Sequence, residues 1–181
     1  MSTDRKPAVA LGIDLGTSGV RAALLSDDGN LIDIAACPFP NAAAARLPST
    51  WWSGVKSCLA ELASRNAFAS LEGVAVDGTS GTVVAIDARG MPVGEAMLYN
   101  DPCPDRTIVE RIDTEAPPDS PARGATSALA RAIHLSRRPG VQAIVHQADW
   151  IVMNLGLASA TSDENNALKT GYDLAAERWP D

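Results

Sequence analysis

A glycine-rich segment near the N-terminus carries residue types that can bind a phosphate. The apolar run Val9–Asp14 ends in a carboxylate, and Gly16-Thr17-Ser18-Gly19 follows before a second apolar run begins at Val20. Successive backbone N–H groups in such a turn can bind an anion, hydroxyls add donors, and a carboxylate at the strand end can hold Mg²⁺. The segment is not a Walker A loop, because the Lys-Ser/Thr pair is missing. On turn chemistry alone, a purely structural hairpin turn is the commoner interpretation.

A second turn of similar composition is suited to a different ligand. Gly78-Thr79-Ser80-Gly81 follows the short apolar run Gly73–Asp77 and offers hydroxyl and N–H groups with no cation. Such groups fit a polyhydroxyl compound, although a turn capped by its own Ser and Thr explains the same residues equally well. Further along, Tyr99-Asn100-Asp101 places an amide and a carboxylate at the end of an extended run. Asp101 could accept hydrogen bonds from two sugar hydroxyls, or it could be a solvated strand-end aspartate.

Two other uses of the chemically active residues are disfavoured. Asp14, Asp77 and Asp101 could form a two-metal nuclease centre, but a nuclease needs a basic track for its substrate and the sequence has none. The net charge is -7, and the basic residues form no cluster larger than a pair such as Arg137-Arg138, so we expect neither nucleic acid nor an anionic membrane as a partner. His134 falls in a predicted helix and is interpreted as a packed or surface histidine.

Composition predicts one domain that spans residues 1–181. The chain is 46% hydrophobic, which is enough for one sizeable core. Its three cysteines, Cys37, Cys58 and Cys103, lack metal-ligand spacing and are predicted to be reduced thiols. No apolar run approaches the roughly 20 residues of a membrane span, and no secretory leader is evident, so a cytoplasmic location is expected.

The elements that must position the first turn form a meander followed by a crossover. Val9–Asp14, Val20–Leu25 and Leu31–Ala35 are predicted to be three antiparallel strands. A helix capped by Ser49 or Thr50 should then cover one face of the sheet. The apolar positions of that helix have helical spacing and are Trp52, Val55, Leu59 and Leu62. The helix makes Gly73–Asp77 a crossover strand, parallel to a neighbour.

The second half of the chain is predicted to alternate strand and helix. The expected elements are extended runs over Thr82–Ile86 and Val93–Tyr99, an exposed loop or linker over Asp113–Gly124, a helix from a Thr126 cap to about Arg138, and a helix over Ala148–Leu155 that is stopped by Gly156. Together with the opening meander, this order predicts an α/β fold with a mixed sheet and covering helices.

Taken in order, these segments resemble the N-terminal domain of the FGGY family of carbohydrate kinases, which includes glycerol kinase, xylulokinase and ribulokinases. The matching pieces are Leu11-Gly-Ile-Asp14-Leu-Gly-Thr17-Ser-Gly-Val-Arg21, Val76-Asp-Gly-Thr79-Ser80-Gly81-Thr82, Tyr99-Asn-Asp101, Ala148-Asp-Trp150, Leu155-Gly156 and Ser162-Asp-Glu-Asn-Asn-Ala-Leu-Lys-Thr-Gly-Tyr172-Asp173. The second, third and last pieces are similar to the xylulokinase-like branch that includes D-ribulokinases. The resemblance implies a ribonuclease-H-like (actin-like ATPase) domain in a cytoplasmic enzyme that uses ATP and Mg²⁺.

The resemblance also implies a role for each turn. In the first, Asp14 is expected to serve catalysis by holding the metal of the Mg²⁺–nucleotide, with Thr17 acting beside it. The residues expected to bind the phosphates or their charge are Gly16, Thr17, Ser18, Gly19 and Arg21. The residues expected to bind the sugar are Thr79, Ser80, Gly81 and Asp101. D-ribulose or xylulose is the favoured acceptor.

Two departures from the family pattern bear on these expectations. Many relatives have an arginine shortly after the Asn-Asp pair, where this chain has Arg106 only after Pro102-Cys103-Pro104-Asp105. Family members also continue into a catalytic aspartate and a second, nucleotide-binding domain, which we expect to be absent from residues 1–181. The chain alone is therefore expected to be inactive, and the second domain is its expected partner. The surface that would meet that domain is expected to be exposed, so the chain could also associate with itself as a homodimer. The alternatives are a sugar-sensing module without catalysis and, less favoured, a metal-dependent phosphohydrolase.

Overall fold

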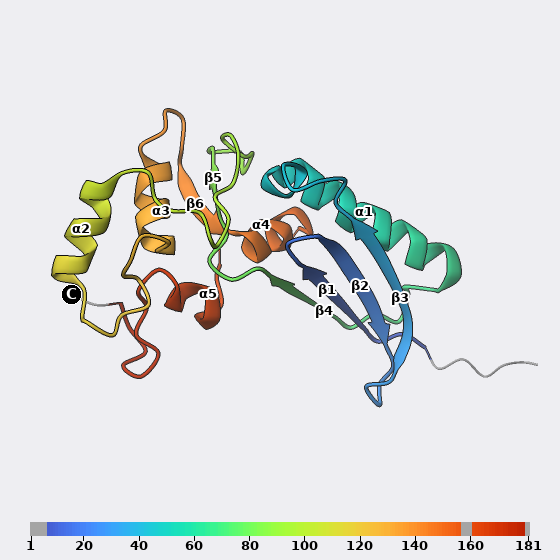
Figure 1. Ribbon diagram of the computed structural model, residues 1–181. Coiled ribbons are helices and arrows are strands. Elements are labelled where there is room, and N and C mark those ends of the chain that lie inside the picture. Colours follow the sequence, from blue (N-terminus) through green and yellow to red (C-terminus); the bar gives the residue numbers. More distant parts are fainter. Residues whose placement is uncertain (1–6, 157–160, 180–181) are drawn as a thin grey trace, which may run out of the picture. The chain divides into compact units, whose positions relative to one another are not determined.

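The computed structural model describes residues 7–156 and 161–179 of the protein. Two compact units follow one another along the chain, Met1–Gly78 and Thr79–Asp181 (Figure 1). Each unit has a sheet of its own. In the described part of the chain, no helix is both long and apolar enough to cross a membrane.

The first unit contains a four-stranded mixed sheet in the order β3-β2-β1-β4. Its strands are β1 (Ala10–Leu15), β2 (Gly19–Leu25), β3 (Leu31–Pro38) and β4 (Gly73–Gly78). The first three strands pair antiparallel, and β4 pairs parallel with β1. The predicted meander and the predicted parallel crossover strand are therefore both confirmed.

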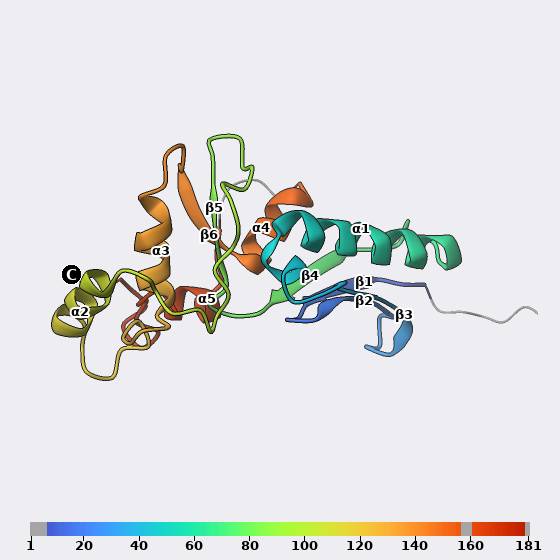
Figure 2. The same cartoon turned by 45° about the horizontal axis from the view of Figure 1, so that its top comes forward.

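Strand periodicity separates the two faces of this sheet. The buried side chains of β1 and β2 alternate and are Leu11, Ile13, Leu15, Val20, Ala22 and Leu24. Helix α1 (Pro48–Arg65) lies along the sheet and packs on β2 and β3 (Figure 2). Because successive side chains of a strand point to opposite faces, Asp14 and Arg21 lie on the face away from this core.

The buried stripe of α1 differs by one position from the predicted stripe. Trp51 and Cys58 are fully buried, and Trp52 and Leu59 are only partly buried; Val55 and Leu62 are buried as predicted. The shift lets the Trp51 indole N–H donate to the Ala45 carbonyl at 2.7 Å.

The predicted N-caps of α1, Ser49 or Thr50, are wrong. The helix begins at Pro48 with Leu47 as the N-cap, and no side chain caps it. Proline suits the first helical position because its φ is preset and its missing N–H would have had no helical partner there. Ser49 and Thr50 consequently lie inside the first turn.

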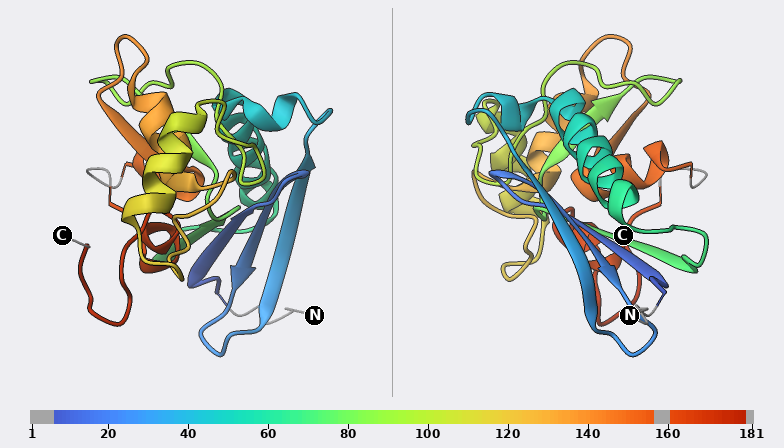
Figure 3. Two further views of the ribbon diagram at one scale, coloured as in Figure 1. Left: turned by 60° about the vertical axis from the view of Figure 1, so that its left-hand side comes forward. Right: turned by 90° about the vertical axis from the view of Figure 1, so that its right-hand side faces the viewer.

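The second unit is built around a two-stranded antiparallel sheet. Strands β5 (Val83–Ile86) and β6 (Ala143–His146) form it. Helix α3 (Ala128–Ser136) packs against β5, and α2 (Arg106–Glu115) lies beside α3 (Figure 3). The chain then continues through two short helices, α4 (Gln147–Asn154) and α5 (Glu164–Leu168).

Several boundaries in the second unit correct the sequence prediction. The run Val93–Tyr99 is no regular strand and makes one isolated bridge, from Met97 to Val83. The N-cap of α3 is Ser127, whose hydroxyl accepts from the Ala130 N–H at 3.1 Å, and not Thr126. Strand β6 and helix α2 were not predicted. Helix α4 was predicted, and Gly156 after it has the positive φ, 90°, of a helix-ending glycine.

The close approach of β2 and β3 at Gly19 yields a prediction about stability. A Cβ atom at Gly19 would lie 2.6 Å from the Cys37 carbonyl oxygen and 2.8 Å from the Pro38 Cα, whereas a Cβ at Gly12 would meet nothing within 4 Å. Gly19→Ala should therefore lower the free energy of unfolding by about 1–3 kcal/mol, because backbone must shift. The matched control Gly12→Ala should change it by less than about 0.5 kcal/mol. Equal urea midpoints for the two variants would contradict the close packing at Gly19.

Candidate functional site

The first glycine turn joins β1 to β2 and leaves its hydroxyl groups exposed. The Gly16 N–H donates to the Gly19 carbonyl at 3.0 Å, and the Phe39 N–H donates to the Ser18 carbonyl at 2.8 Å. These two bonds hold the backbone, while the Thr17 and Ser18 side chains face solvent. The turn is thus a hairpin, and its polar side chains remain accessible to a ligand.

A hollow of about 260 Å³ opens beside this turn. Its lining residues come from the turn and from the adjacent ends of β2 and β3, and they are Gly16, Ser18, Gly19, Val20, Arg21, Ala36, Cys37 and Pro38. Arg21 is the only positively charged residue among these lining residues. A small anion is the ligand that such a lining suits.

The pairing register aligns three charged residues on the open face of the sheet. Asp14 lies opposite Arg21 across β1 and β2, and opposite Asp77 across β1 and β4. The Arg21 Nη1 is 3.5 Å from the Asp14 Oδ2, and the two side chains are 64% and 50% exposed. Asp77 accepts a 2.8 Å hydrogen bond from the Gly78 N–H.

Asp14, Arg21 and Asp77 suit the binding of Mg²⁺ together with a nucleotide better than the binding of a metal ion by protein side chains alone. Among the residues that the structure describes, no group of three or more His, Cys, Asp or Glu side chains could hold a metal ion. Mg²⁺ bound to a nucleotide takes one or two carboxylates and completes its shell with phosphate oxygens and water. Asp14 and Asp77 are suitable for that role.

The second glycine turn connects β4 to β5, which belong to different sheets, so it is not a hairpin. The Thr79 N–H donates to the Gln147 side-chain oxygen at 3.0 Å, and the Thr82 N–H donates to the Thr79 carbonyl at 3.1 Å. Gly81 has φ of 82°, a conformation that favours glycine. Ser80 is partly buried, and its hydroxyl lies 3.5 Å from the Asn165 carbonyl.

Asp101 ends a tight turn in the same unit. Its carboxylate accepts from the Leu98 N–H at 2.7 Å, and its own N–H donates to the Leu98 carbonyl at 3.0 Å. Asp101 therefore has a structural contact in addition to any contact with a ligand. Arg106, the arginine that follows the Asn-Asp pair, is the exposed first residue of α2.

A buried arginine behind the second turn was missed by the sequence analysis. Arg131 on α3 is only 1% exposed, and its Nη2 donates to the Gly81 carbonyl at 2.9 Å. Its Nε donates to the Ser127 carbonyl at 3.3 Å. Burial lowers the pKa of Arg131, and the negative charge of Asp101 raises it. The guanidinium is thus hydrogen-bonded to the second glycine turn and interacts electrostatically with Asp101.

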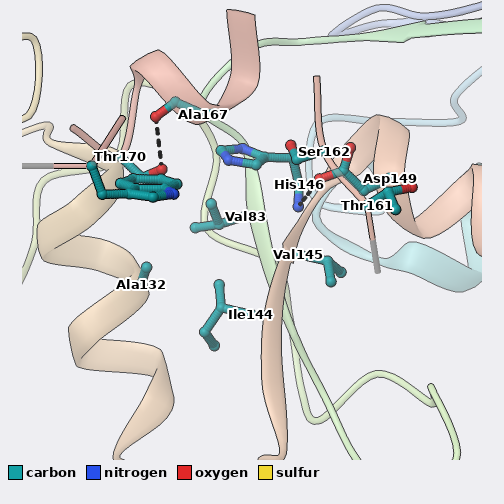
Figure 4. A pocket seen from close by; sticks show the side chains of 11 residues that line it. Val83, Ala132, Ile144, Val145, His146, Asp149, Thr161, Ser162, Ala167 and Thr170 are labelled. Atoms are coloured by element: carbon teal, nitrogen blue, oxygen red, sulfur yellow. Dashed lines mark hydrogen bonds between the residues drawn. The ribbon is translucent and has the colours of Figure 1, made fainter. Parts of the chain in front are cut away.

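A small cavity of about 190 Å³ lies at the start of α4 (Figure 4). The His146 imidazole and the Asp149 carboxylate line it, over an apolar floor that includes Val83 and Ile144. Burial lowers the pKa of His146 and raises the pKa of Asp149. Asp149 also accepts from the His146 backbone N–H at 3.2 Å, so it caps α4.

A family model covers both glycine turns. The model of the FGGY family of carbohydrate kinases, N-terminal domain, matches residues 9–120, more than half of the chain. The chain belongs to the FGGY family. The resemblance inferred from the motifs is confirmed, and so is the mixed α/β fold of the actin-like ATPase type.

Solved structures of FGGY kinases have the same fold. The xylulose kinase from Rhodospirillum rubrum is 25% identical, with a TM-score of 0.73 over 92% of this chain and 38% of that one. The xylulose kinase from Bifidobacterium adolescentis is 18% identical, with a TM-score of 0.74 over 96% and 41%. The glycerol kinase from Plasmodium falciparum, solved with ADP, is 14% identical, with a TM-score of 0.75 over 96% and 39%. The chain therefore spans about two fifths of the length of these kinases.

The structure groups the predicted site residues of this FGGY chain by unit. The residues predicted at the nucleotide come together at the β1–β2 turn of the first unit, and they are Asp14, Gly16, Thr17, Ser18, Gly19 and Arg21. The residues predicted at the sugar lie in the second unit, and they are Thr79, Ser80, Gly81 and Asp101. The sequence signal for Arg131 was a single cation among the small apolar residues of Ala128–Ala132.

The exposure of the Asp14–Arg21 pair yields a prediction that separates stability from function. Asp14→Asn and Arg21→Gln should each change the free energy of unfolding by less than about 1 kcal/mol, since exposed ion pairs contribute little. Asp33→Asn is the comparison, because Arg65 and Asn66 donate to that carboxylate at 2.9 and 2.7 Å. Urea unfolding at neutral pH measures all three variants.

The comparison variant should lose clearly more stability. Hydrogen bonds from Arg65 and then Asn66 lower the pKa of Asp33 to about 2, from the ordinary value of 3.8. The stabilising contribution is therefore complete at neutral pH and is lost only as the pH falls from about 4 toward 2. A large loss in Asp14→Asn instead would show that Asp14 is structural.

Proposed function

We propose that the protein carrying this chain is an ATP-dependent sugar kinase, which transfers the γ-phosphoryl group of MgATP to a hydroxyl of a ketopentose-like sugar. D-ribulose or xylulose is the favoured acceptor. The observation that carries the proposal is the exposed Asp14–Arg21 pair beside an open glycine turn, in a chain of the FGGY family. The proposed location is the cytoplasm.

The first unit supplies the groups for the phosphates. Asp14, with Asp77 beside it, would hold Mg²⁺, which neutralises charge on the phosphates when it is bound. The N–H groups of the turn and the Thr17 and Ser18 hydroxyls donate to phosphate oxygens, and Arg21 adds a positive charge. Because phosphoryl transfer depends mainly on positioning and charge neutralisation, these groups need to be exposed and preorganised.

The second unit supplies the groups for the acceptor. Ser80 and Asp101 orient the sugar through hydrogen bonds to its hydroxyls, and Thr79 and Gly81 shape the turn. The site offers neutral donors and one carboxylate, so it favours a polyhydroxyl compound over a phosphorylated one. The base that accepts the hydroxyl proton and the adenine-binding domain are expected outside residues 1–181, as the family resemblance implies.

The test of this function is an ADP-release assay with a panel of ketopentoses, ketohexoses and polyols, in which sugar phosphate is identified by mass. ADP formation that depends on one ketopentose supports the proposal. Sugar binding without transfer by the whole protein would favour the sensing module, and phosphate release from phosphoesters without any acceptor would favour a phosphohydrolase. The 181-residue chain by itself should give no sugar phosphate.

Asp14→Ala should lower kcat strongly and change sugar affinity much less. The missing carboxylate would act on metal-bound phosphates, while the sugar contacts in the second unit remain. The control is Asp27→Ala, an exposed aspartate in the turn between β2 and β3. Steady-state kinetics with MgATP and the sugar varied in turn measure both effects. Wild-type turnover in Asp14→Ala would remove Asp14 from the mechanism.

Ser80→Ala should weaken sugar binding by about 1–3 kcal/mol, because a polar partner of the sugar is lost. Asp101→Ala should have an effect of the same size plus some loss of stability, since the Leu98 N–H also loses its acceptor. Binding of ATP should stay nearly unchanged in both. Ser136→Ala is the control for the serine, because that hydroxyl only bonds the Ile133 carbonyl within α3. Titration calorimetry that finds equal losses for sugar and ATP would point to misfolding.

A further inference from the structure

We propose that Arg131 is the positioning residue of the acceptor site, which holds the Thr79–Thr82 turn in the arrangement that binds the sugar. The inference rests on the proposed function and assigns a role to a residue outside both glycine turns. Arg131 acts through the residues that it contacts.

The contacts of Arg131 connect separate parts of the second unit. The Nη2 donates to the Gly81 carbonyl across 50 positions of sequence, at 2.9 Å. The Nε donates to the Ser127 carbonyl at 3.3 Å, which joins the guanidinium to the first turn of its own helix. A Cβ atom at Gly81 would lie 3.7 Å from the Nη2, so the guanidinium packs directly on the turn.

These contacts fix the orientation of Ser80. The Gly81 carbonyl belongs to the peptide plane between Gly81 and Thr82, and Thr82 donates back to the Thr79 carbonyl at 3.1 Å. The Arg131 guanidinium holds this peptide plane through its hydrogen bond, and φ at Gly81 is 82°. Ser80, the preceding residue, therefore has little conformational freedom. A hydroxyl that is fixed before the ligand arrives binds more tightly, because less conformational entropy is lost on binding.

The charge of Arg131 is costly unless the site uses it. The side chain is 1% exposed. Its Nη1 is buried and has no hydrogen-bond partner within the described protein. Burial of a charged guanidinium is costly, and a core that needed only volume would be better served by an apolar side chain.

Asp101 is the charged group that benefits. Its negative charge interacts electrostatically with the buried Arg131 guanidinium. In the proposed site this carboxylate accepts hydrogen bonds from sugar hydroxyls. The guanidinium thus holds the turn through a hydrogen bond and also attracts the carboxylate.

The test compares Arg131→Met and Arg131→Lys with the matched pair Arg138→Met and Arg138→Lys in the whole kinase. Arg138 is a suitable control because it also donates to two backbone carbonyls, of Val93 and Glu95, away from the predicted sugar turn. Arg131→Met should raise the KM for the sugar at least about tenfold, the effect expected when hydrogen bonds to a charged group are lost. Arg131→Lys, which keeps the charge, should lose less, and the KM for ATP should stay within about twofold in both.

A local measurement separates this inference from the proposed function. Amide hydrogen exchange at Thr82 should be faster in Arg131→Met than in wild type, with or without sugar, and unchanged in Arg138→Met. If the wild type binds no sugar of the panel, the proposed function fails, and the Thr82 exchange still decides whether Arg131 holds the turn. Unchanged exchange at Thr82, a sugar KM within twofold of wild type, or equal rises in both KM values would each overturn the positioning role.

Discussion

The register of β1 against its two neighbours is the constraint on which the candidate phosphate site depends. Pairing of Asp14 with Arg21 on one side and Asp77 on the other puts all three on the open face, while Ile13 and Leu15 enter the core beneath α1. A slip of one residue would bury the carboxylate and expose the apolar set, so the hydrophobic pattern of the strand selects this register. The close approach at Gly19 then fixes the turn that carries Thr17 and Ser18.

In the second unit, the turn that carries the Thr79 and Ser80 hydroxyls is not held by strands of one sheet on both sides. The turn after Asp77 leaves one sheet and enters another, so no strand pairing defines its shape. Side chains do this instead, with the Gln147 amide accepting from Thr79 and the Arg131 guanidinium donating to Gly81. The cost of burying Arg131 is offset when these contacts preorganise a binding site.

Sequence reasoning succeeded where the signal was local and periodic. The alternation of β1 and β2, the glycine turns and the crossover through α1 were predicted because each depends on residues that are near in sequence. It failed at the α1 stripe, where Trp51 is buried in place of Trp52 and its indole N–H donates to the Ala45 carbonyl, a contact that helical spacing alone does not predict. Strand β6 was missed because its four residues are too few to show a period, and Arg131 was missed because its contacts span 50 positions.

The most direct test of the account is hydrogen exchange on the whole protein with each ligand added separately. The central claim is that the chain binds phosphate in its first unit and sugar in its second. MgADP should slow exchange in a peptide that covers residues 14–21, and the acceptor sugar should slow exchange in peptides that cover residues 79–82 and 98–101. Protection of residues 79–82 by MgADP alone, or of residues 14–21 by sugar alone, would contradict the division of roles between the two turns.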